Sequence, residues 1–171
     1  MLIYGSQLIG LSVGSLEENR MVAKVKKILI NKNSAIVVGF IIHLDGLFGP
    51  NLFLSTSDIV STDRNGVVVN KKDNFVATEE VLLAKKIIDD RFNLFGLPAR
   101  VARSKKRLGK VSDFIVDTQS FQIIKFCIKG LWEDRIFPLS EVRKITNKEI
   151  IFEKDVEKIT AKKALTEEVK I

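Results

Sequence analysis

The chain has little of what most catalytic, metal-binding and disulfide-bonded proteins depend on. Of its 171 residues, one is cysteine, one is histidine and three are prolines. A single cysteine excludes an intrachain disulfide, so folding needs no oxidising compartment. A lone histidine leaves a histidine metal site without a second imidazole, and makes any nucleophile–histidine pair depend on His43. No cofactor or metal site is therefore expected.

Long hydrophobic runs are also missing. The longest apolar stretch, Ala35–Ile42, has eight residues and is too short to cross a bilayer as a helix. The N-terminal region has no basic segment followed by a long apolar stretch, so we predict no signal peptide. These features favour a cytoplasmic, soluble protein without membrane insertion.

Charge is present in excess of one sign and is unevenly placed. The net charge is +7 at neutral pH. Residues 1–92 hold 11 basic and 10 acidic side chains, whereas residues 93–171 hold 17 basic and 11 acidic ones. An acidic partner is therefore expected to meet the second half of the chain.

What the chain does have is an internal repeat. Leu8–Leu11 reads LIGL and Leu94–Leu97 reads LFGL, and the strand-like segments Lys24–Asn31 and Lys110–Asp117 share a pattern at the same offset of 86 positions. The offset falls to 83 toward the end of each copy, as expected from a small difference in loop length. A period this long predicts two globular units, not a solenoid.

Both copies have the composition of small β domains. Short β-branched and aromatic runs separated by Gly, Asn, Asp and Ser dominate residues 8–76 and 94–153. Between them, Thr78 is placed as an N-cap before an apolar pattern of helical period, which predicts a helix over residues 78–91. The predicted organisation comprises a first domain (1–76), a linking α-helix (77–92), a second domain (93–153) and a charged C-terminal tail, helical or frayed (154–171).

One strand of the first copy has apolar residues on both faces. Simple alternation places Val38, Phe40 and Ile42 inside, and Val37 and Ile41 outside. An apolar outer stripe must be covered. The helix over 78–91 is the leading candidate and the second domain is the other, while a homodimer through an outer sheet face is also open.

Two loops carry a leucine followed by an aromatic residue between strands. Leu47 and Phe48 lie in the first copy, and Leu131 and Trp132 lie in the second. Aromatic residues are frequent anchors of interfaces, so these four are candidate partner-binding residues. The alternative is that both loops fold over the domain ends and bury these side chains within the molecule.

A basic patch is the second candidate binding feature. It consists of Arg103, Lys105, Lys106, Arg107 and Lys110, beside the start of a strand. Such a patch could contact phosphates or an acidic protein surface. A solvated hairpin tip is the favoured alternative, because no aromatic residue interleaves the cluster to stack on bases.

No residue set points to catalysis. Cys127 falls on a strand, where packing explains it better than nucleophilic chemistry. Asp113 and Asp117 resemble a carboxylate pair, but four residues of extended strand separate them by roughly 13 Å, too far to share a proton. We expect them to accept hydrogen bonds from backbone donors at a bulge or turn.

The second half resembles a PRC-barrel domain. This family is shared by the cytoplasmic part of the photosynthetic reaction-centre H subunit and the C-terminal part of the ribosome maturation factor family. The resemblance lies in three segments, Leu108–Asp117, Ile123–Phe126 and Arg135–Val142. It implies a compact six-stranded β-barrel used for binding or assembly. Through the repeat it extends to residues 8–76, where Asn31 stands in place of Asp117 and Ser55 in place of Pro138.

Taken together, the pattern and the resemblance predict a mainly β protein of two tandem six-stranded PRC-type barrels joined by a linking α-helix. We expect a prokaryotic, non-enzymatic adaptor that docks a protein partner through its aromatic loops. The alternative is a factor associated with RNA or ribosomal particles that binds through its basic second barrel.

Overall fold

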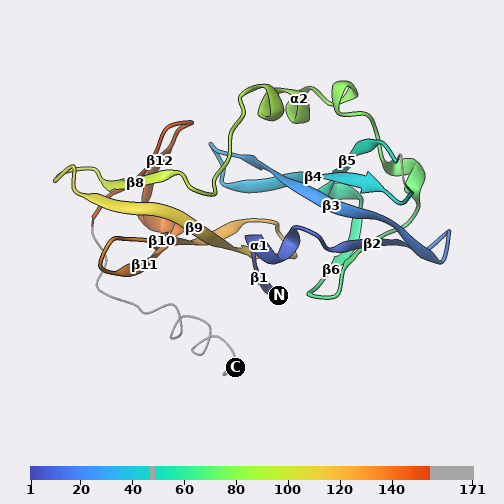
Figure 1. Ribbon diagram of the computed structural model, residues 1–171, viewed down its shortest axis with the longest axis horizontal. Coiled ribbons are helices and arrows are strands. Elements are labelled where there is room, and N and C mark those ends of the chain that lie inside the picture. Colours follow the sequence, from blue (N-terminus) through green and yellow to red (C-terminus); the bar gives the residue numbers. More distant parts are fainter. Residues whose placement is uncertain (47–48, 155–171) are drawn as a thin grey trace. The chain divides into compact units, whose positions relative to one another are not determined.

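The computed structural model describes residues 1–46 and 49–154, and the chain is mainly β (Figure 1). It divides into two compact units. Unit 1 holds Met1–Phe92 and Val116–Gln122, whereas unit 2 holds Asn93–Ile115 and the chain from Ile123 onward. The segment Val116–Gln122 belongs to the second sequence copy but packs within unit 1.

The first copy forms one curled sheet with the strand order β5-β4-β3-β2-β7-β6. Its neighbours are antiparallel except for the parallel pair β2 and β7. The elements of this copy are β1 (Leu2–Tyr4), α1 (Gly5–Leu8), β2 (Ser12–Ser15), β3 (Arg20–Asn31), β4 (Ile36–Leu44), β5 (Asn51–Ser55), β6 (Ile59–Thr62), β7 (Val67–Val69) and the short 3-10 helices Thr56–Asp58, Lys72–Asn74 and Thr78–Glu80.

The second copy repeats this order as β11-β10-β9-β8-β13-β12, again with one parallel pair, β8 and β13. Its elements are β8 (Pro98–Val101), β9 (Arg107–Asp117), β10 (Ile123–Lys129), β11 (Asp134–Pro138), the 3-10 helix Leu139–Glu141, β12 (Val142–Ile145) and β13 (Ile150–Phe152). β1 is the seventh strand of this sheet. In unit 1, Met1 O accepts a hydrogen bond from Thr118 N, 2.8 Å away. The prediction of a mainly β chain holding two similar sheets is confirmed.

The repeat extends to backbone details that the sequence does not show directly. Left-handed backbone recurs at an offset of 86 at three places, Gly10 and Gly96, Asn19 and Lys105, and Ala35 and Phe121. The pairing of β2 with β3 and that of β8 with β9 each contain one extra residue on the longer strand, Val22 and Leu108. These residues also lie 86 positions apart, so both copies share the same bulge.

A second bulge corrects the predicted faces of β4. Leu29 pairs with Gly39 while Ile30 pairs with Val37, so Val38 is an extra residue on β4. The bulge reverses the alternation on its N-terminal side, because two residues of one strand oppose one of the other. Val37 is consequently fully buried, and Val38 packs on the outside. The prediction of Val38 inside and Val37 outside was wrong.

The helix α2 (Leu82–Asp89) covers the outer stripe of the first copy, as the leading expectation had it (Figure 1). Ala84 and Ile87 are buried against Leu29 and Phe53, and Ile41 packs on the same cluster. The helix is shorter than the predicted 78–91, because Val81 adopts an extended conformation, with φ −111° and ψ 102°. Thr78 therefore begins a separate 3-10 turn and does not cap α2.

Candidate docking groove of unit 2

Unit 2 contains a groove of about 820 Å³ at the start of β9. It is bounded by β8, by the loop that joins β10 to β11, and by the turn between β12 and β13. The lining residues are Pro98, Ala99, Arg100, Lys106, Arg107, Leu108, Gly109, Lys110, Gly130, Leu131, Trp132, Glu133, Arg135 and Glu149. The groove thus joins segments that lie up to 51 positions apart in sequence.

The floor of the groove is built by the β9 bulge and by two glycines. Ala99 and Leu108 are 2% and 3% exposed. Gly109 has φ 131°, and a Cβ there would overlap Lys129 O. Gly130 is similarly close to Glu133 O, and its N donates to that oxygen over 3.1 Å. Only glycine lets β9 and the 130–133 loop approach this closely.

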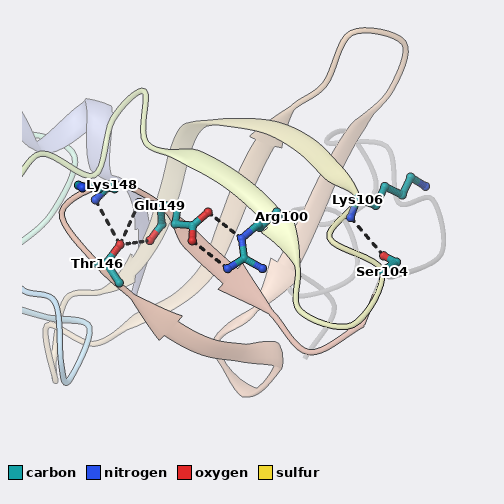
Figure 2. A network of polar contacts seen from close by, with 6 residues as sticks. All are labelled: Arg100, Ser104, Lys106, Thr146, Lys148 and Glu149. Atoms are coloured by element: carbon teal, nitrogen blue, oxygen red, sulfur yellow. Dashed lines mark hydrogen bonds and ion pairs between the residues drawn. The ribbon is translucent and has the colours of Figure 1, made fainter.

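One wall of the groove is a bidentate ion pair, shown in Figure 2. Arg100 Nε donates to Glu149 Oε2 over 2.7 Å, and Arg100 Nη2 donates to Glu149 Oε1 over 2.9 Å. Thr146 fixes the turn that presents Glu149: its Oγ1 accepts from Lys148 N and Glu149 N and donates to Glu149 O. The paired geometry matches the planar fork of guanidinium to a carboxylate.

Each partner of this pair shifts the pKa of the other. The hydrogen bonds from Arg100 lower the pKa of Glu149, and the hydrogen bonds to Glu149 raise that of Arg100. Both groups are therefore charged throughout the physiological range. The opposite charges cancel locally, so this wall is electrically close to neutral.

The other wall holds a second internal ion pair. Arg135 Nη2 donates to Glu133 Oε2 over 2.9 Å, and the Arg135 side chain is 14% exposed. Two arginines of the groove thus each face a carboxylate of the groove itself.

The rim differs from the walls in both charge and exposure. Leu131 and Trp132 are 93% and 92% exposed. Arg107, Lys110 and Lys106 are exposed beside them. An exposed aromatic next to cations can receive an apolar or flat group while the cations attract negative charge.

The structure thereby joins two predicted features that the sequence showed separately. Leu131 and Trp132 line the same groove as Lys106, Arg107 and Lys110. An aromatic residue accordingly stands beside the basic patch, although none interleaves it in sequence. Arg103 and Lys105 are exposed at the β8–β9 turn and do not line the groove. Leu47 and Phe48 lie outside the described residues.

Sequence reasoning missed Arg100, Glu149, Glu133 and Arg135. A signal for the first two was available in the repeat: Arg100 corresponds to Gly14 at offset 86, and Glu149 corresponds to Gly66 at offset 83. The repeat thus marks both positions as places where the second copy has a charge and the first has glycine.

The residues considered for catalysis are buried or make local hydrogen bonds. Burial raises the pKa of Cys127 to about 11, so its thiol is protonated at neutral pH. His43 Nδ1 lies 3.1 Å from Asn51 Oδ1, an amide oxygen. Asp113 accepts from Phe114 N over 2.8 Å, and Asp117 accepts from Gln119 N and from Ser120 Oγ. Each aspartate thus serves a local donor, as expected.

Within residues 1–46 and 49–154, no three His, Cys, Asp or Glu side chains gather in a way that could hold a metal ion. No helix in these same ranges is long and apolar enough to cross a bilayer. In comparisons with known proteins, no family model and no curated protein matches the chain.

Proposed function

We propose that this chain is a tandem PRC-type barrel protein that works as a non-catalytic adaptor, and that its unit 2 groove docks an acidic segment of another protein. The observation that carries the proposal is the rim, where Leu131 and Trp132 are almost fully exposed beside three cationic side chains. Large apolar side chains held in solvent next to a groove are typical of interaction sites.

The charge of the site supports an acidic partner. Five basic and two acidic residues line the groove, so its lining has a net positive charge. Exposed rim charges attract an oppositely charged surface and raise the association rate more than they raise the final affinity. We therefore expect capture of the partner to weaken as salt is added.

The direct test is capture of partners from native lysate on the immobilised full chain. Trp132→Ala should lose the partner that the unaltered chain retains. Leu82→Ala is the matched control, because Leu82 is an exposed leucine on α2 of unit 1, outside the groove. Equal recovery by Trp132→Ala and the unaltered chain would remove the groove from the adaptor role.

A second candidate function is association with RNA or ribosomal particles. Trp132 beside Lys106, Arg107 and Lys110 offers one stacking platform next to phosphate-binding cations. This function predicts co-sedimentation with ribosomal particles that falls steeply with salt, because phosphate contacts release counterions. Protein docking is favoured because Glu133 and Glu149 pair with Arg135 and Arg100, which leaves fewer unneutralised cations in the groove for a run of phosphates.

A further inference from the structure

The groove pairs two of its five cations with its own carboxylates, and this pairing carries an inference that rests on the proposed docking role. Arg100 and Arg135, in the walls, are 29% and 14% exposed, and each is bonded to a carboxylate of the groove. Arg107 and Lys110, on the rim, are exposed. The two paired arginines therefore add little net charge to the groove, and its excess positive charge comes from Lys106, Arg107 and Lys110.

We infer that Glu149 is a specificity residue: it neutralises Arg100 so that the groove accepts an uncharged side chain flanked by acidic residues and rejects a polyphosphate chain. An apolar side chain entering the groove meets Ala99, Leu108 and Trp132. Acidic neighbours in the same peptide then lie within reach of the rim. A phosphate placed between the walls would meet Glu133 and Glu149, and the two arginines there are already bonded to these carboxylates.

The geometry suits Glu149 to this role. It holds Arg100 through two hydrogen bonds, and the Thr146 turn fixes its backbone independently of its side chain. Replacing the carboxylate by an amide therefore leaves the turn in place, removes one of the two acceptors and leaves the charge of Arg100 unneutralised for an external anion.

Trp132 makes the test direct, since it is the only tryptophan in the chain. Its fluorescence is titrated with three probes: the peptides Glu-Glu-Phe-Glu-Glu and Glu-Glu-Glu-Glu-Glu, and oligouridylate. The unaltered chain should bind the phenylalanine peptide more tightly than the other two. Equal binding of both peptides, or tighter binding of oligouridylate, would overturn the inference. No fluorescence response to either peptide would instead count against the proposed docking function.

Glu149→Gln should raise the affinity for oligouridylate severalfold and steepen its dependence on the logarithm of salt concentration by about 0.7, the increment for one added phosphate contact on a single strand. Glu79→Gln is the charge control, because it changes net charge equally at an exposed position in unit 1. The double change Arg100→Gln with Glu149→Gln should return the affinity to its original value. If Glu149→Gln behaves like Glu79→Gln, Glu149 does not set specificity.

Discussion

The two copies share a backbone plan and differ most where the second one forms its groove. Strand order, the bulges at Val22 and Leu108 and the three left-handed positions all recur. Yet Gly14 and Gly66 in the first copy become the bonded pair Arg100 and Glu149 in the second. The fold thus tolerates either no side chains or two opposite charges at this site, which leaves the site free to acquire a binding role.

The outer faces differ as well. In the first copy the face holds Leu29, Ile41 and Phe53, and α2 packs on it. The second copy has Ile115, Cys127 and Ile136 at the same pairing positions, all buried, together with Lys125 where the first copy has Gly39. Gly39 leaves room for the Phe53 ring and for Leu54 O, so this position of the first copy has no space for a side chain, whereas the second copy holds a lysine there.

The largest expected effect on stability comes from placing a lysine at Gly39, the position in the first copy that corresponds to Lys125. In Gly39→Lys the new Cβ would overlap the Phe53 ring and Leu54 O, so we expect a loss of about 3 kcal/mol in the free energy of unfolding. The measurement is urea denaturation followed by circular dichroism. The reverse change, Lys125→Gly, should cost about 0.5–1 kcal/mol, the usual penalty of glycine within a strand. Equal losses would show that the two faces are equally open.

The next largest effect on stability is expected at a buried position that the two copies share, the last residue of β6 and of β12. Thr62 is 8% exposed, and its Oγ1 has no hydrogen-bond partner within the described part of the chain, whereas the second copy has Ile145 there. Ile145→Thr should lower stability by about 2 kcal/mol, since it buries an unsatisfied hydroxyl. Thr62→Val should raise it by about 1 kcal/mol. A lower melting temperature for Thr62→Val would mean that the hydroxyl is satisfied in solution.

The acid sensitivity of the two copies should also differ. Arg100 lowers the pKa of Glu149 from its ordinary 4.5, so the pair stabilises unit 2 above pH 4.5 and this contribution is lost as the pH falls through the lowered pKa. Glu149→Gln should remove that part of the acid dependence. Urea midpoints above and below pH 4.5, followed by circular dichroism, measure it. Parallel pH curves for both chains would contradict the expectation.

The smallest effect on stability is expected at Trp132. Because this side chain is 92% exposed, Trp132→Ala should change the free energy of unfolding by no more than about 0.5 kcal/mol. Trp132→Phe gives the loop the Leu-Phe sequence of the first copy and should retain docking. Loss of stability in Trp132→Ala, seen in thermal melts, would indicate that the ring packs within the molecule.

Much of the fold could be predicted from local patterns. The repeat predicted two sheets of one kind, and the apolar stripe of β4 predicted a cover, with the helix over 78–91 as the leading candidate. The faces on which Val37 and Val38 lie could not be predicted. A bulge depends on how two strands pair, and neither strand shows it alone. The predicted start of α2 was also wrong. Thr78 is a residue type that can cap a helix, but in the structure it begins a separate 3-10 turn.

The candidate site was only half predictable. Exposed aromatic and basic residues could be selected by type, and the structure gathers Leu131, Trp132 and three of the five basic residues in one groove. The repeat marks Arg100 and Glu149 as positions where the first copy has glycine, but it does not show that they meet, because 49 positions separate them and many other charges lie between. Their meeting depends on the parallel pairing of β8 with β13.

The duplication and the β character of each copy could be read from the sequence, because these follow from periodicity and local residue preferences. Tertiary structure alone decided which side chains became neighbours. Strand register, bulges and ion pairs are properties of several segments at once, and it was their combination that built a neutral-walled, cationic-rimmed groove around Trp132.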